Sequence, residues 1–259
     1  MSEMDTLVDL EAFSPLNSQV QPTSATSQTA YANAVPTHLA FTISRQSGSG
    51  AHVVSQKLAE YLQVRSPKNS RSWMIFDRNL VDQVLEDHHL PRRLGRFMPE
   101  DRVSEMEDTM SELLGGHPPS WMMARQIAET ILRLGEEGNV ILIGRGANLI
   151  TRKLPHVFHV RLVGSVEKRA QHLSETCKIS HRSALELIRK EDRGRQRYLR
   201  KHFAEDPENP LLYHLVINTD FVPYEKAAVM IAEAALSGLH LKPAQFRFDQ
   251  GAFYPLDAP

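Results

Sequence analysis

The amino-acid sequence predicts an α/β fold in which a five-stranded parallel sheet is flanked by helices. Three observations support this prediction. Five short apolar runs are separated by longer stretches with helical periodicity. The first run is followed by a glycine- and serine-rich loop and then by an amphipathic stretch. The 259 residues, 41% of them hydrophobic, suffice for one main domain in which strands pair in parallel through helical crossovers.

The expected strands are short runs rich in β-branched and other apolar residues. They cover residues 39–43, 73–76, 140–143, 157–162 and 214–217. Two glycines and two glutamates at 135–138 separate a helical stretch from the third strand, and prolines precede the fourth strand and the last helix. We expect that last helix at 222–236, so the domain spans residues 38–237.

The two ends of the chain lack the periodicity of its centre. Residues 1–37 are rich in Ser, Thr, Gln, Ala and Pro. We expect a disordered N-terminal tail there, because such a segment buries too little apolar surface to offset its ordering entropy. Residues 238–259 form a C-terminal extension that either packs on the domain or pairs with another chain. The termini are therefore candidate contacts for a homo-oligomer or a protein partner.

Charge and cysteine content narrow the classes of partner and compartment. The chain has 30 Lys and Arg against 31 Asp and Glu, so duplex nucleic acid is not an expected partner. Its one cysteine, Cys177, excludes an intramolecular disulfide and a multi-cysteine metal site. No apolar run reaches the roughly 18 residues of a membrane span, and the N-terminus has no signal-peptide pattern. We expect a cytoplasmic protein without a membrane partner.

The loop after the first strand has the layout of a phosphate-binding loop with substituted side chains. A Walker A loop is Gly, four residues, then Gly-Lys-Ser/Thr. Its backbone N–H groups approach phosphates, its lysine reaches the outer phosphates, and its hydroxyl holds magnesium. Here the glycines of the turn at 48–50 remain, but Arg45 stands at the first glycine, Ala51 at the lysine and His52 at the hydroxyl. The pattern alone fits either a phosphate site or a plain tight turn.

Three further segments carry arginines where they can meet a phosphate. Arg145 follows the third strand between two glycines, at the end of the sheet where ligands bind in open α/β folds. Arg169 lies at the end of the first turn of the helix after the fourth strand. The basic stretch 188–202 puts Arg193 and Arg197 on one helical face, and guanidinium groups clamp phosphate oxygens in a two-pronged manner. Ion pairs or a solvated helix face would also explain each segment taken alone.

Together, these segments resemble the cytidylate kinase-like branch of the P-loop nucleoside monophosphate kinases, over about residues 39–236. The matching motifs are Ile-Ser-Arg-x-x-Gly-Ser-Gly at 43–50, Phe-Asp-Arg at 76–78, Gly-Arg-Gly-Ala at 144–147, Glu-x-Arg at 167–169, an Asp-x-x-Arg-x-x-Tyr-like helix at 192–198, and Tyr-His-Leu-x-Ile-Asn-Thr at 213–219. Each motif is short, and their order is the specific feature. The resemblance implies a P-loop kinase three-layer sandwich with a helical lid at about 189–205.

The resemblance also implies a reaction and a set of site residues. The reaction is ATP-dependent phosphoryl transfer to a nucleoside monophosphate such as CMP, with Mg²⁺ as a cofactor. The implied catalytic cations are Arg145, Arg193 and Arg197. The residues implied to hold ATP are Arg45, Ser47, Gly48, Ser49, Gly50, Ala51 and His52. Those implied to hold the acceptor are Asp77, Arg78, Arg145 and Arg169, and either Asp77 or Asp192 is a candidate to orient magnesium through water.

The sequence departs from true cytidylate kinases at three positions of this site. Ala51 and His52 replace the loop lysine and hydroxyl, and Gly146 follows Arg145 where those enzymes carry aspartate. Losing a charged hydrogen bond to a phosphate costs on the order of 1.5 to 3 kcal/mol, although Arg45 beside the loop can compensate. Two functions therefore stay open: a kinase with a degenerate phosphate loop, and a weak or inactive nucleotide-binding regulatory protein on a kinase scaffold.

Overall fold

The computed structural model describes residues 38–67, 70–77, 80–89 and 120–238. The chain divides into two units, Met1–Asn33 and Ala34–Pro259. The first unit lies outside the described residues, and everything below concerns the second. The expected tail at 1–37 and, apart from residue 238, the expected extension at 238–259 also lie outside the described residues, so the domain limits stay predictions.

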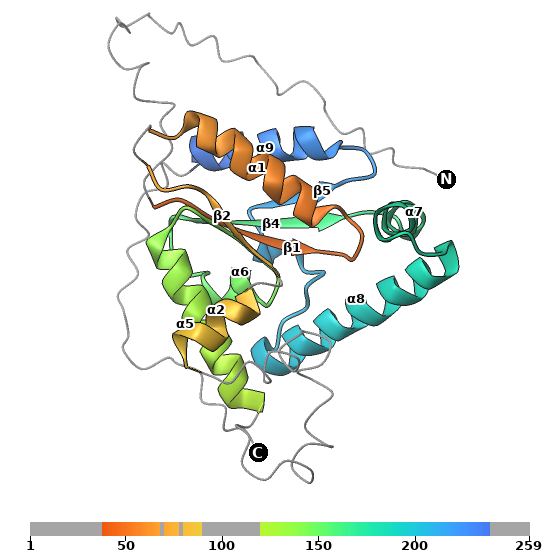
Figure 1. Ribbon diagram of the computed structural model, residues 1–259, viewed down its shortest axis with the longest axis horizontal. Helices are drawn as coiled ribbons and strands as arrows, with labels where there is room; N and C mark the ends of the chain where they lie inside the picture. The colour runs from red at the N-terminus through yellow and green to blue at the C-terminus, as the bar shows by residue number, and fades with distance from the viewer. Residues whose placement is uncertain (1–37, 68–69, 78–79, 90–119, 239–259) are drawn as a thin grey trace, which may run out of the picture. The chain divides into compact units, whose positions relative to one another are not determined.

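Strands and helices alternate along the described chain, as the sequence predicts (Figure 1). The elements are β1 (Ala40–Arg45), α1 (Ala51–Arg65), β2 (Met74–Phe76), α2 (Leu80–Asp87), α5 (Ser120–Glu137), β3 (Val140–Ile143), α6 (Ala147–Ile150), β4 (Val157–Val163), α7 (Val166–Cys177), α8 (His181–Phe203), η2 (Pro210–Leu212), β5 (Leu215–Asn218) and α9 (Tyr224–Gly238). Each predicted strand is present, with its ends within two residues of the expected bounds.

The described strands form a five-stranded sheet in the order β2-β3-β1-β4-β5. Every neighbouring pair is parallel, and Ala40 of β1 is in register with Val140 of β3 and Val157 of β4. The predicted α/β fold with a parallel sheet is therefore confirmed. Because the strands are parallel, the loops after β1, β3 and β4 leave the sheet at one edge.

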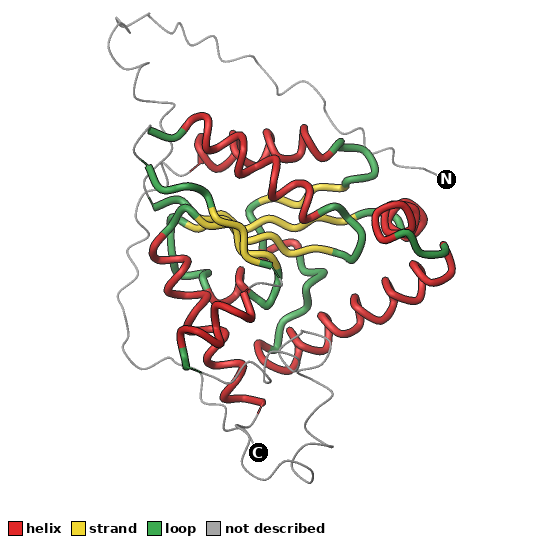
Figure 2. The backbone as a smooth tube through the Cα atoms, viewed as in Figure 1, coloured by secondary structure: helices red, strands yellow, loops and turns green. Residues whose placement is uncertain are grey.

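Helices cover both faces of the sheet, giving three layers (Figures 1 and 2). On one face α1 and α9 pack on the sheet, and the apolar side chains of α1 at Val54, Leu58 and Leu62 recur at helical spacing and are fully buried. On the other face the cluster includes Leu142 of β3 and Ile131 of α5. Within the described residues, no helix is long and apolar enough to cross a membrane.

Two histidines on β4 and just before β5 lie within the sheet layer. Thr42 Oγ1 lies 2.9 Å from Nδ1 of His159, and the backbone N–H of His159 donates to Nδ1 of His214 at 2.8 Å. The two rings stack with their centroids 4.9 Å apart. Burial, with a smaller contribution from the charge of His214, lowers the pKa of His159 from 6.5 to about 3. His159 is therefore neutral in the folded protein at neutral pH.

Candidate functional site

The loop between β1 and α1 is a tight turn that only glycine can complete. Gly48 and Gly50 adopt φ angles of +82° and +80°, which disfavour any residue with a Cβ. A Cβ on Gly48 would lie 2.6 Å from the carbonyl oxygen of Arg169, and a Cβ on Gly50 would lie 2.3 Å from the ring of Tyr224. The hydroxyl of Ser49 closes the turn by donating to the carbonyl of Gln46 at 2.8 Å. The loop is thus held against both α7 and α9.

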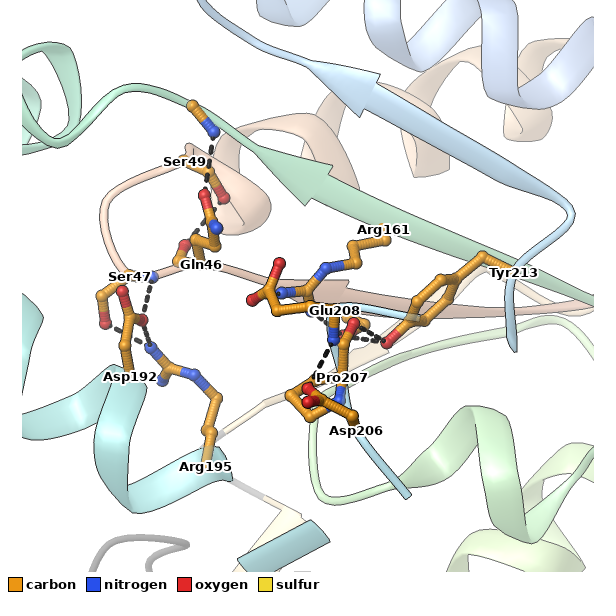
Figure 3. A network of polar contacts seen from close by, with 12 residues as sticks. Gln46, Ser47, Ser49, Arg161, Asp192, Arg195, Asp206, Pro207, Glu208 and Tyr213 are labelled. Atoms are coloured by element: carbon orange, nitrogen blue, oxygen red, sulfur yellow. Dashed lines mark hydrogen bonds and ion pairs between the residues drawn. The ribbon is translucent and has the colours of Figure 1, made fainter. Parts of the chain in front are cut away.

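The carboxylate of Asp192 on α8 collects donors from three separate elements (Figure 3). Its Oδ1 accepts the backbone N–H of Ser47 at 2.8 Å and Nη2 of Arg195 at 2.5 Å. Its Oδ2 accepts Nη1 of Arg169 at 2.7 Å. The loop, α7 and α8 therefore direct hydrogen-bond donors at one oxyanion.

Arg169 is buried at the centre of this cluster. Only 6% of its side chain is exposed, and it also donates to the carbonyls of Gly164 at 2.9 Å and Ser47 at 3.0 Å. It lies in the first turn of α7, whose N-cap Ser165 accepts a hydrogen bond from the N–H of Lys168. The predicted site residue Arg169 thus lies directly against the loop.

A second carboxylate joins the same cluster through the side chain of Ser47. The Ser47 hydroxyl donates to Glu191 and accepts from Nη2 of Arg195 at 2.6 Å. Arg195 Nη1 lies 3.6 Å from the Glu191 carboxylate. Helix α8 presents these residues because Ala184 and Ile188 pack in one apolar cluster with α7. The carboxylates and Arg195 lie one to two turns farther along on that side.

The arginines of α8 divide between two faces of the helix. Arg193 and Arg197, the predicted lid cations, are exposed, whereas the side chain of Arg195 is only 13% exposed against the loop. Sequence reasoning missed Arg195, although the Asp-x-x-Arg spacing from Asp192 puts both residues on one face. The roles expected for Arg193 and Arg197 stay predictions.

Other predicted residues gather at the ends of the neighbouring strands. Arg145 follows β3 and is 8% exposed, with φ at +53° between two glycines whose φ angles are also positive. Its turn is joined to β1, because the N–H of Gly144 donates to the carbonyl of Ile43 at 3.0 Å. Arg45 Nη2 lies 3.6 Å from Oδ1 of Asp77, at the ends of β1 and β2. Arg78 lies outside the described residues.

The two substituted Walker positions supply neither a cation nor a hydroxyl to the loop. Ala51 is buried in the first turn of α1. His52 is exposed, and its Nε2 lies 3.2 Å from Nε2 of Gln56 one turn along the same helix. The arginines of α7 and α8 are thus the cations that the structure brings to Ser47.

A cavity of about 170 Å³ adjoins the loop on the side of α7 and α9. Its lining residues are Gly48, Lys168, Arg169, Gln171, His172, Glu175, Thr219, Asp220 and Tyr224. The rings of His172 and Tyr224 meet edge to face with centroids 5.3 Å apart. Hydrogen bonds from Ser165 lower the pKa of Asp220, and burial raises the pKa of Tyr224. Sequence reasoning did not predict this cavity, which combines aromatic and charged groups beside the loop.

A separate polar network lies on β4 (Figure 3). Arg161, with 4% of its side chain exposed, donates to Ser44 Oγ at 2.9 Å and to Glu208 at 2.5 Å. Its guanidinium carbon lies 5.6 Å from the ring centroid of Tyr213. The network ties the segment after α8 to the sheet.

Comparison with known proteins assigns the family. The sequence profile of the cytidylate kinase-like family matches residues 41–221. The chain belongs to the cytidylate kinase-like family. No curated protein sequence matches it.

Solved structures agree with this assignment at the level of the fold. An uncharacterized protein from Eubacterium ventriosum is 19% identical, with a TM-score of 0.55 over 77% of this chain and 99% of that one. A shikimate kinase from Acinetobacter baumannii, in complex with shikimate, is 17% identical, with a TM-score of 0.44 over 79% of this chain and 96% of that one. A gluconokinase from Sinorhizobium meliloti is 14% identical, with a TM-score of 0.41 over 78% and 92%.

As a member of the cytidylate kinase-like family, the protein is kinase-like, and such a protein implies a phosphate-bearing nucleotide and magnesium. The donors around Asp192 fit a phosphate group, because the backbone N–H of Ser47 and two guanidinium groups already hold an oxyanion there. Among the described residues, no group of three or more His, Cys, Asp or Glu side chains could hold a metal ion. The residues therefore fit the phosphates and do not identify magnesium ligands.

Proposed function

We propose that the protein is an ATP-dependent kinase that transfers the γ-phosphoryl group to a nucleoside monophosphate, CMP or a related small acceptor. One observation carries this proposal: Ser47 N–H, Arg169 Nη1 and Arg195 Nη2 converge on a single oxyanion beside the glycine loop. Phosphoryl transfer requires such fixed donors, because its catalysis rests on positioning and on stabilising charge at the phosphate oxygens.

The residues around the loop divide into a donor side and an acceptor side. On the donor side, residues 45–52 hold the ATP phosphates, and Arg195 and Arg169 supply the positive charge that a loop lysine would otherwise give. The cavity beside Gly48 takes the nucleoside part of ATP, where the rings of His172 and Tyr224 offer apolar surface. When bound, magnesium ATP supplies the phosphoryl group.

The acceptor side lies at the ends of β2 and β3. Arg145, buried at the carboxyl end of β3, holds the acceptor phosphate, and Asp77 and Arg78 line the same side. The exposed Arg193 and Arg197 reach the transferring group when a ligand is bound. Arginine suits this task because its planar fork binds two phosphate oxygens at once.

A second function is favoured by the composition of the loop itself. Ala51 and the exposed His52 offer neither the cation nor the hydroxyl found in active Walker loops. The alternative is therefore a nucleotide-binding regulatory protein with weak or no catalysis. In either case we propose a cytoplasmic protein whose termini contact a partner or a second copy.

The test is ADP release from magnesium ATP with CMP, dCMP, UMP, AMP and GMP offered one at a time. We expect acceptor-dependent ADP that Arg145→Ala abolishes. We expect Arg195→Ala to lower kcat/KM by about 10²- to 10³-fold, the effect of losing one fixed oxyanion contact. Arg182→Ala is the matched control, because Arg182 lies on the same helix and is 90% exposed.

Three results would redirect the proposal. Equal rates for Arg195→Ala and Arg182→Ala would contradict the assigned site. ATP binding without turnover would favour the regulatory function. Absence of binding to every nucleotide tested would contradict both functions.

A further inference from the structure

The carboxylate of Asp192 lies where a phosphate group would lie in the site described above. Both of its oxygens accept hydrogen bonds, and the donors come from the loop, α7 and α8 at 2.5 to 2.8 Å. A backbone N–H and two guanidinium groups are the donors that proteins use for phosphate oxygens. Asp192 therefore uses the same donors that a bound phosphate would need.

Glu191 completes this occupation from the adjacent position of α8. It accepts the hydroxyl proton of Ser47 and lies 3.6 Å from Nη1 of Arg195. The two carboxylates thus offset the two positive charges of Arg169 and Arg195. An incoming polyphosphate would meet a neutralised loop and two like charges, so its binding is opposed as long as both carboxylates stay in place.

Both carboxylates are able to leave the loop. The side chains of Glu191 and Asp192 are 31% and 29% exposed, so each already reaches solvent. The guanidinium of Arg169, in contrast, is buried and anchored to two backbone carbonyls. The cations and the loop are therefore the fixed part of the cluster, and the carboxylates are the exchangeable part.

We propose that Glu191 and Asp192 act as a built-in substitute for phosphate, which holds the lid helix α8 on the loop until a polyphosphate ligand displaces it. The proposal rests on the proposed function, since it assumes that the loop takes a nucleotide. Binding is then an exchange of anions on Ser47, Arg169 and Arg195. The acid pair lowers the affinity for any polyphosphate and makes release of α8 from the loop a condition of binding.

The test is calorimetric titration of the full chain with inorganic tripolyphosphate and, separately, with magnesium ATP. We expect Asp192→Asn to bind tripolyphosphate at least about tenfold more tightly than the unmodified chain, because asparagine keeps the size of the side chain and removes its charge. Glu191→Gln should also bind more tightly, by a smaller factor, and it keeps the test valid if Asp192→Asn does not fold. Glu186→Gln is the matched control, since it removes one negative charge from an exposed position of α8 and should stay within about twofold.

The outcomes separate this proposal from the proposed function. If the unmodified chain binds ATP and both acid variants bind tripolyphosphate equally or more weakly, the carboxylates only position the arginines and the exchange is refuted. If Glu186→Gln strengthens binding as much as Asp192→Asn does, the effect is one of net charge and the proposal is again refuted. If no form binds either ligand, the proposed function fails and this inference fails with it.

Discussion

Replacing Arg169 by glutamine tests the buried cluster that joins α7, α8 and the glycine loop. The guanidinium is 6% exposed and makes three hydrogen-bonding contacts, to Asp192 and to the carbonyls of Gly164 and Ser47. Glutamine is too short to keep all three. The substitution therefore leaves two carbonyl oxygens without this donor and one carboxylate without its buried cation.

The expected loss of stability follows from those contacts. Removing one partner of a buried ion pair costs about 3 to 5 kcal/mol. Asp192 is 29% exposed and keeps its bonds to Arg195 and Ser47, so we discount the loss to about 2 to 4 kcal/mol. With a urea m value of about 3 kcal/mol/M, the unfolding midpoint falls by roughly 1 M.

The assay is urea unfolding followed by far-ultraviolet circular dichroism, with Arg182→Gln as the control. Arg182 pairs with Glu186 at 3.3 Å, but the two side chains are 90% and 65% exposed. Such a surface pair contributes at most about 1 kcal/mol, so the control midpoint should move by less than about 0.3 M. Equal midpoints for Arg169→Gln and Arg182→Gln would refute the load assigned to the buried cluster.

Two further substitutions have defined outcomes. Gly50→Ala places a Cβ 2.3 Å from the ring of Tyr224 at a φ of +80°, so calorimetry should show ATP affinity reduced by more than about tenfold; unchanged affinity would contradict the assigned loop. Because burial lowers the pKa of His159 from 6.5 to about 3, the unfolded chain binds more protons between these pH values, and stability falls as pH falls. His159→Gln should remove up to about 1.4 kcal/mol per pH unit of that dependence in urea unfolding between pH 7 and 5; identical slopes for both proteins would contradict a buried neutral His159.

The sheet and the glycine loop were predictable because their signals are local. Each strand is a short apolar run, and the turn at Gly48 and Gly50 is written in consecutive residues. Parallel pairing follows from the alternation of strands and helices. None of these inferences required knowing which elements meet in space.

The identity of the loop-facing arginine was not predictable from the charge pattern. Residues 189–202 carry arginines around the helix, so Arg193 and Arg197 satisfy helical spacing as well as Arg195 does. The face toward the loop is set by the packing of Ala184 and Ile188 near α7. That apolar face continues through Asp192 and Arg195, and its continuation was the signal available in the sequence.

The cavity beside the loop was out of reach for a different reason. Its lining comes from the loop at Gly48, from α7 at residues 168–175 and from the segment 219–224. These segments meet because β4 pairs with β1, and β5 with β4. Strand order depends on competition among long-range pairings, which a single sequence does not display.

The most direct test of a phosphate-binding loop is a crystal structure with magnesium and a non-hydrolysable ATP analogue. We predict that the triphosphate lies against residues 46–52, with the Ser47 N–H donating to a phosphate oxygen and Arg169 and Arg195 contacting the same group. A triphosphate bound elsewhere on the chain, with Ser47 still bonded to Asp192, would contradict the account.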